Sequence, residues 1–170
     1  MKLLLSALLL PLFLVGCYES PVPIVKLSDN SVQKVNEEYV GNWVGDKIPK
    51  LKILKFSNKE YLIIWADKNN NTNVGQGYSV KIKEHDFMII RNINSEKPSY
   101  IFAKYSLSDT DKTKLLIMNV VDDKLFNDKK INNSETLYKF IEKNINNREL
   151  YGNTYIFMKL NETNYKVKLN

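Results

Sequence analysis

Few residues in this 170-residue chain could perform chemistry, because it has one cysteine, Cys17, and one histidine, His85. A Ser-His-Asp or Cys-His catalytic site would have to use His85. That residue lies between Glu84 and Asp86 in a polar segment that is typical of a surface turn between two strands. One histidine and one cysteine are too few for a typical zinc or copper site. We therefore expect a non-enzymatic protein with no catalytic residue, metal or cofactor.

Two further motifs resemble ligand sites but fail at their critical positions. Residues 67–71, Asp-Lys-Asn-Asn-Asn, echo the alternating oxygen ligands of a calcium loop. Such a loop needs glycine at its sixth position and glutamate at its twelfth, where this chain has Thr72 and Tyr78. Gly75-Gln76-Gly77 is too short to hold a phosphate and is not followed by a helix. We expect a polar turn at the first motif and a flexible hairpin entry at the second.

The surroundings of Cys17 point to covalent modification. Lys2 precedes a short apolar stretch over residues 3–15, the arrangement of a secretory signal peptide. The stretch is well below the roughly 20 residues that a membrane-spanning helix needs. Leu14-Val15-Gly16-Cys17 at its end resembles the lipobox of bacterial lipoproteins. The resemblance implies cleavage after Gly16 and a diacylglyceryl group on Cys17, with further acylation that makes the anchor stable.

The same resemblance implies a location. By analogy with lipoprotein sorting in Gram-negative bacteria, Tyr18 after the cysteine favours the outer membrane, facing the periplasm, over retention in the inner membrane. The expected partners are the membrane, through the N-terminal lipid, and a second envelope protein. The sequence does not indicate an oligomeric state.

Charge excludes one class of partner. The chain carries a formal net charge of +6, but its lysines are dispersed and its only arginines are Arg91 and Arg148. Proteins that read nucleic acids cluster Arg and Lys among aromatic residues or on a recognition helix. We therefore expect no nucleic-acid binding.

Composition divides the chain into three parts. Residues 1–16 form the predicted signal peptide. Residues 17–36 are predicted to be a lipidated, flexible tether, because Pro21 and Pro23 favour extended backbone and polar residues follow. Residues 37–170 are predicted to form a single β-rich domain, which is long enough to bury a hydrophobic core.

Within that domain, short apolar or alternating runs separated by turn residues predict many strands. In one of them the alternation changes phase between Ile53 and Leu54, which predicts a β-bulge. Residues 134–145 have helical spacing of apolar residues, with Ser134 as the expected N-cap. A shorter helical turn is expected at 122–126. The predicted strands cover residues 51–56, 60–66, 78–83, 87–93, 100–107, 115–121, 155–160 and 165–169.

This pattern predicts a mainly β fold, an antiparallel meander that forms a small barrel or a strongly curved sheet with one helix in its C-terminal half. Gly41-Asn42-Trp43, at the start of the first strand, resembles the Gly-x-Trp that opens lipocalins and other calycin barrels. The resemblance implies that Trp43 plugs the closed end of the barrel. The central Thr-Asp-Tyr motif of lipocalins is absent, and Arg148 does not occupy the position of their arginine.

Aromatic residues on the predicted strands allow two interpretations. Trp43, Trp65, Tyr78 and Phe102 could line a ligand cavity in the barrel interior, or they could fill its core. The leading hypothesis is therefore a membrane-anchored, non-enzymatic protein-binding or structural module. The alternative is a lipocalin-like carrier of a small apolar ligand, and a weaker alternative is an unrecognised hydrolase.

Overall fold

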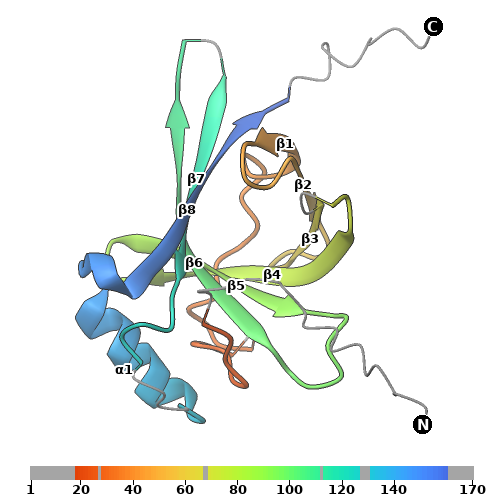
Figure 1. The fold of residues 1–170 in the computed structure, drawn as a ribbon. Helices are drawn as coiled ribbons and strands as arrows, with labels where there is room; N and C mark the ends of the chain where they lie inside the picture. Colours follow the sequence, from red (N-terminus) through yellow and green to blue (C-terminus); the bar gives the residue numbers. More distant parts are fainter. Residues whose placement is uncertain (1–17, 27, 67–68, 112, 127–130, 161–170) are drawn as a thin grey trace, which may run out of the picture.

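The protein is a closed barrel of eight antiparallel strands, as seen in a computed structural model (Figure 1) that describes residues 18–26, 28–66, 69–111, 113–126 and 131–160. The strands are β1 (Gly41–Gly45), β2 (Lys50–Lys55), β3 (Tyr61–Ala66), β4 (Thr72–Ile82), β5 (His85–Asn92), β6 (Tyr100–Asp109), β7 (Lys114–Val121) and β8 (Tyr151–Lys159). The helix α1 (Ser134–Asn144) and the short 3-10 helix η1 (Arg148–Leu150) lie between β7 and β8. The prediction of a β-barrel with one late helix is confirmed.

Each strand pairs with its neighbours in sequence, and the first strand also pairs with the last. Trp43 of β1 lies opposite Leu51 of β2 on one side and opposite Lys159 of β8 on the other. This last pairing closes the meander, so all eight strands have partners on both sides. The predicted strand over 165–169 lies outside the described residues.

Two local predictions about strands are wrong. β2 pairs with β3 in unbroken register from Lys50 to Lys55, without a bulge; Leu54 simply points outward, where it is half-buried. Gly75 and Gly77 lie within β4 and not at a flexible hairpin entry. A Cβ atom on Gly77 would lie 2.7 Å from Cδ1 of Ile63, so this strand needs glycine to let the neighbouring side chain into the barrel.

The N-cap of the helix lies one residue earlier than expected. The Asn133 side chain accepts hydrogen bonds from the backbone N–H groups of Glu135 and Thr136, so Asn133 is the N-cap and Ser134 the first helical residue. Leu137 and Ile141 on α1 are fully buried. At residues 122–126 the chain forms a hydrogen-bonded turn and not a helix.

Two apolar clusters stabilise the fold, one on each side of β4, β5 and β6. The inner cluster fills the barrel and includes Trp43, Ile63 and Met88. The outer cluster lies between these three strands, α1 and the N-terminal segment. Its main buried residues are Ile24, Tyr78, Val80, Ile82, Phe87, Ile89, Phe102, Phe126, Leu137 and Ile141.

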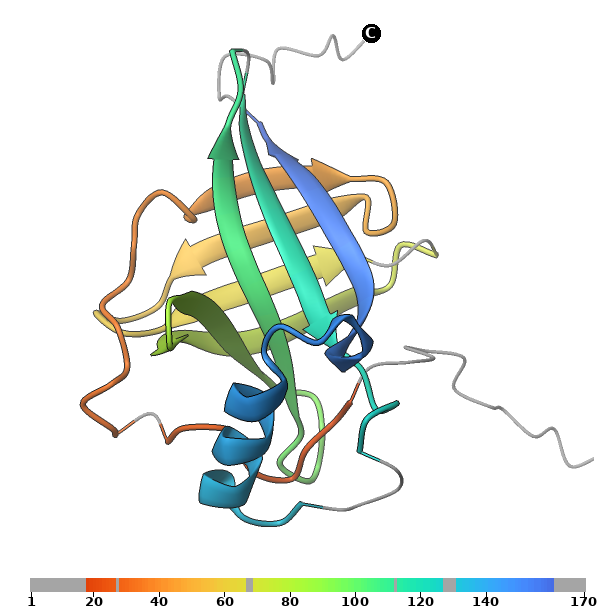
Figure 2. The same ribbon diagram turned by 90° about the vertical axis from the view of Figure 1, so that its left-hand side faces the viewer.

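The N-terminal segment, residues 18–26 and 28–36, packs on the barrel, so the prediction of a flexible tether is wrong for it. Ile24 and Val32 are 2% and 4% exposed and belong to the outer cluster. In the backbone, the Tyr18 N–H donates a hydrogen bond to the Val121 carbonyl, and the Ser20 N–H donates one to the Tyr100 carbonyl. The prolines favour extended backbone as expected, but the apolar residues beside them dock it on the sheet. Figure 2 shows the segment, red to orange, running along the outside of the strands.

Candidate functional site

The barrel interior is filled mainly by side chains. Trp43 is 1% exposed, and its indole N–H donates to the Tyr39 carbonyl at 2.9 Å. Trp65 is half-buried at the edge of the same inner cluster. The structure thus brings two of the four predicted interior aromatics together inside the barrel.

Tyr78 and Phe102 lie on the opposite side of the sheet, in the outer cluster. In β4 the residues that point inward are small, namely Gly75, Gly77 and Ser79, because large side chains from other strands fill the interior. Tyr78 therefore points outward, and its hydroxyl donates to the Val25 carbonyl of the N-terminal segment. These two aromatics are core residues outside the barrel, and they line no interior cavity.

One end of the barrel, here called the mouth, retains an apolar cavity of about 80 Å³. Ile48, Trp65, Val120 and Tyr155 are among the residues that line it. A second gap deeper in the interior has a volume of about 10 Å³. Sites for drug-sized ligands usually have volumes of about 300–1,000 Å³. The interior can thus take a small apolar group but not a ligand of that size.

Tyrosines close the opposite end of the barrel. The Tyr105 hydroxyl donates to Ser79 Oγ at 2.7 Å, and the Asn36 backbone N–H donates to the Tyr61 hydroxyl at 2.8 Å. The Tyr39 ring packs edge-on against Tyr105, with ring centroids 4.8 Å apart. Burial raises the pKa of Tyr39 to about 12. These neutral hydroxyls form hydrogen bonds with one another and with the backbone, so their role is structural.

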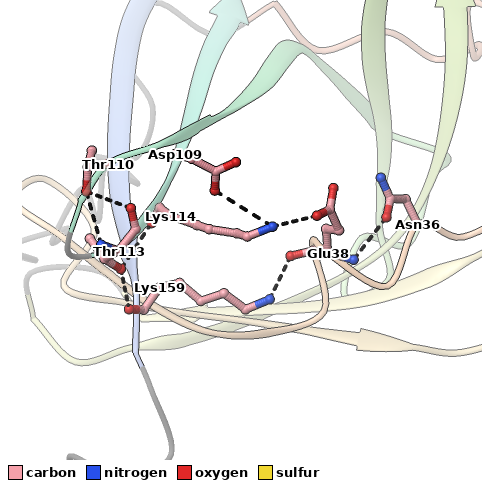
Figure 3. A network of polar contacts seen from close by, with 7 residues as sticks. All are labelled: Asn36, Glu38, Asp109, Thr110, Thr113, Lys114 and Lys159. Atoms are coloured by element: carbon pink, nitrogen blue, oxygen red, sulfur yellow. Dashed lines mark hydrogen bonds and ion pairs between the residues drawn. The ribbon is translucent and has the colours of Figure 1, made fainter.

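A polar network fastens the chain that crosses this closed end (Figure 3). The Lys114 ammonium is 2.5 Å from the Glu38 carboxylate and 3.8 Å from Asp109. Lys159 donates to the Glu38 carbonyl at 2.7 Å, and the Asn36 side chain accepts from the Glu38 backbone N–H. Lys114 lowers the pKa of the Glu38 carboxyl by hydrogen bonding and charge. The network ties residues 36–38 to β7 and β8.

A larger hollow, here called the outer groove, lies on the outside of the barrel beneath the N-terminal segment and has a volume of about 320 Å³. It combines two cations, a carboxylate and two tyrosines, whereas the mouth cavity is almost wholly apolar. Sequence reasoning missed it, because the segment was predicted to be free of the barrel. Its lining residues are Pro23, Lys26, Glu60, Gln76, Tyr78, Arg91 and Tyr100.

A second surface feature, here called the apolar strip, consists of Val44, Leu115, Ile117, Ile156 and Met158. Cross-strand pairing places them on one outward face of β7, β8 and β1: Leu115 and Val44 both lie opposite Met158, and Ile117 lies opposite Ile156. Ile156 and Met158 are 50% and 51% exposed. Neither α1 nor the N-terminal segment covers this face.

His85 lies at the start of β5, where its ring Nε2 is 3.2 Å from both Asn146 and Glu84. Within the described ranges, no group of three or more His, Cys, Asp and Glu side chains is arranged to hold a metal ion. In the same part of the chain, no helix has the length and apolarity to cross a membrane. Cys17 lies outside the described residues, directly before Tyr18.

Comparison with known proteins gives no family for this chain. No protein-family model, curated protein or solved structure matches it. Its classification therefore depends on its own topology, which is that of an eight-stranded antiparallel β-barrel.

Proposed function

We propose that this chain is a lipid-anchored protein of the bacterial cell envelope, whose barrel is a non-enzymatic protein-binding module. The signal region and Cys17 support the anchor. The apolar strip, which no described segment covers, is the observation that carries the binding role, because exposed apolar patches on soluble domains mark interaction sites. By resemblance to sorted lipoproteins, the outer membrane facing the periplasm is the proposed location.

The surroundings of the strip indicate the chemistry of the partner. Lys50 and Lys52 on β2, next to β1, are both exposed. Lysines beside an apolar surface favour a partner that presents apolar side chains flanked by Asp and Glu. The basic balance of the whole chain acts in the same direction, since it attracts an acidic protein surface over longer distances.

The anchor is tested with Cys17→Ser. Wild-type protein labelled with a radioactive fatty acid should carry the label and fractionate with membranes. The Cys17→Ser protein should lose both properties, because it lacks the thiol that would bear the lipid. Continued labelling of that variant would overturn the anchor.

The binding role is tested by capture from the native envelope. The lipidated wild-type protein should retain an acidic partner that Ile156→Ser and Met158→Ser variants lose at least tenfold. The matched control is Phe56→Ser, because Phe56 is 61% exposed and lies in the β2–β3 connection, outside the strip. Equal retention by the strip variants and the wild type would refute the strip as the binding surface.

A carrier of a small apolar ligand is the second candidate, and the apolar lining of the mouth cavity favours it. The cavity volume of about 80 Å³ limits such a ligand to a small group. Extraction of purified protein with organic solvent, followed by mass spectrometry, tests this candidate. A stoichiometric apolar compound that is lost on replacing Trp65 with a charged residue would favour the carrier.

A further inference from the structure

Two cations face the outer groove. Lys26 comes from the N-terminal segment and Arg91 from β5, and both are exposed. In the described part of the chain, neither side chain forms a hydrogen bond or an ion pair. A guanidinium can bind a phosphate or a carboxylate through two parallel hydrogen bonds, and an ammonium adds a point charge. This side of the groove is therefore suited to an anionic group.

The groove also carries one fixed negative charge. Glu60 Oε1 accepts from Gln76 Nε2 at 2.7 Å, and Glu60 Oε2 accepts from Ser57 Oγ at 3.0 Å. These bonds hold the carboxylate in place, and each oxygen keeps a lone pair that can accept from another donor. The half-buried ring of Tyr100 provides an aromatic face that can contact a cation. Together these groups suit a small ligand that carries both a phosphate and an ammonium.

The groove has the size and rigidity of a binding site. Its volume of about 320 Å³ falls within the range typical of small-molecule pockets. Its walls are preformed, because the Tyr78 hydroxyl bonds to the Val25 carbonyl and so ties the N-terminal segment to β4. Ile24, buried between them, holds the same wall in place. A ligand would therefore meet little cost of ordering the protein.

One wall of the groove lies close to the residue that would carry the lipid. Tyr100 exchanges two backbone hydrogen bonds with Ser20, at 2.9 and 3.0 Å. Ser20 is three residues beyond Cys17, and three residues of extended chain span about 10 Å. If Cys17 is anchored, the head-group layer of the same bilayer lies beside the groove at a high effective concentration.

We propose that the outer groove binds the phosphoethanolamine head group of a membrane phospholipid. The phosphate contacts Arg91 and Lys26, and the ammonium contacts Glu60 and the Tyr100 ring. This inference rests on the proposed anchoring at Cys17, which makes the bilayer the neighbour of the groove. Binding there would hold the barrel in a defined orientation on the membrane.

The head group is tested apart from the anchor by using the full Cys17→Ser protein. It is mixed with vesicles of phosphatidylethanolamine and phosphatidylglycerol, and binding is measured by co-flotation. The comparison is with vesicles that contain phosphatidylcholine in place of phosphatidylethanolamine, at the same fraction of phosphatidylglycerol. We expect about tenfold tighter binding to the ethanolamine vesicles, because choline has no N–H to donate to Glu60. Equal binding to both vesicles would overturn the proposal.

Variants locate the site. Arg91→Gln and Lys26→Gln should each weaken binding about tenfold. Arg148→Gln is the matched control because Arg148 is the other arginine, and Lys34→Gln serves for Lys26 because both are exposed lysines of the N-terminal segment. Glu60→Gln should abolish the preference for ethanolamine over choline. Equal losses in Arg91→Gln and Arg148→Gln would show a non-specific charge effect and overturn the groove.

Soluble ligands distinguish a lipid from other zwitterions. Glycerophosphoethanolamine should shift the backbone NMR signals of Arg91 and Tyr100 and should compete with the vesicles. Inorganic phosphate and glycine should each bind at least tenfold more weakly, since each lacks one of the two groups at the required spacing. If glycine binds as tightly, the groove takes soluble zwitterions and the lipid proposal is wrong. Lipid labelling of the wild-type protein at Cys17 is a separate measurement that does not depend on the groove. A failure of the proposed anchor would therefore be distinguished from a failure of the proposed head-group site.

Discussion

Two parts of the barrel wall differ in what lies on their outer side. β4, β5 and β6 are buried on both faces, because α1 and the N-terminal segment cover their outer residues. β7, β8 and β1 bury mainly their inner face; only Val121 and Tyr151, at the ends of β7 and β8, reach the outer cluster, and the rest of the outer face carries the apolar strip. Both parts have apolar outward residues, such as Val80 on one and Ile156 on the other. The difference shows that segments outside the barrel decide which apolar face becomes core and which stays available.

The largest expected difference is in the free energy of unfolding. Phe102→Ala, on the covered part, should destabilise the protein by about 3–5 kcal/mol, because it leaves a cavity in the outer cluster. Met158→Ala, on the apolar strip, should cost less than about 1 kcal/mol, because the side chain is half exposed. Urea unfolding followed by tryptophan fluorescence measures both. Similar losses would mean that the strip is also covered.

The cover itself can be weakened from the N-terminal side. Ile24→Ala should cost about 2–5 kcal/mol, because Ile24 is 2% exposed and packs in the outer cluster. Val25→Ala, at a half-buried neighbour, is the control and should cost less. The same urea titration applies. An unchanged free energy of unfolding in Ile24→Ala would indicate that the N-terminal segment is a flexible tether after all. The segment would then not be part of the cover.

Packing inside the barrel can be tested by adding a methyl group at an inward-facing glycine. Gly77→Ala should cost about 1–3 kcal/mol, because the new methyl group would lie 2.7 Å from Ile63 Cδ1 and 3.2 Å from Met88 Sδ. Gly152→Ala is the control, since Gly152 is exposed on β8. Thermal unfolding followed by circular dichroism measures both. A neutral Gly77→Ala would show that the interior is looser than the packing indicates.

Alkaline pH tests the burial of the tyrosines. Burial raises the pKa of Tyr39 to about 12, above the value of about 10 expected in the unfolded chain. Its contribution to stability is therefore complete below about pH 10 and is lost as the pH rises through 12. The free energy of unfolding, measured by urea titration, should fall as the pH rises from about 10 to 12. In Tyr39→Phe it should fall less steeply, by up to about 1.4 kcal/mol per pH unit. An unchanged slope in Tyr39→Phe would contradict this.

The smallest expected effect concerns the helix in the cover. Asn133→Ala should cost about 1 kcal/mol through loss of two bonds to the first helical turn. Ser134→Ala should be close to neutral, because Ser134 is inside the helix and not its cap. Chemical denaturation followed at 222 nm measures both. The reverse order would place the cap at Ser134.

The sequence predicts the strands and the barrel well, because apolar alternation and turn residues are local signals. It does not predict which face of β4 points inward. Tyr78, Val80 and Ile82 alternate with polar residues, as on a strand that buries its apolar side in a barrel, yet this side faces outward. The reason lies elsewhere in the chain, since inward side chains such as Ile63 and Ile90 occupy the space facing Gly75 and Gly77.

The candidate site was less predictable than the fold. The outer groove exists only because the N-terminal segment docks on the barrel. In the sequence, Pro21 and Pro23 indicate an extended tether more strongly than the scattered apolar residues of the segment indicate docking. Ile24 and Val32 were the available signal, eight residues apart and without a regular period. Arg91 and Glu60 are 31 positions apart in the sequence, so no local pattern could bring them together.

The pairing of β1 with β8 also sets when the protein can complete its fold. Trp43 and Lys159 are opposite each other although they are 116 positions apart in the chain, so β8, the last strand that the structure describes, is required to close the barrel against β1. Contacts of such long range form slowly. A chain that crosses a membrane from its N-terminus would keep β1 and β7 as unpaired edges until β8 emerges. If the chain is exported, this delay would keep it unfolded while it passes through the membrane. The barrel would then close only after β8 has crossed.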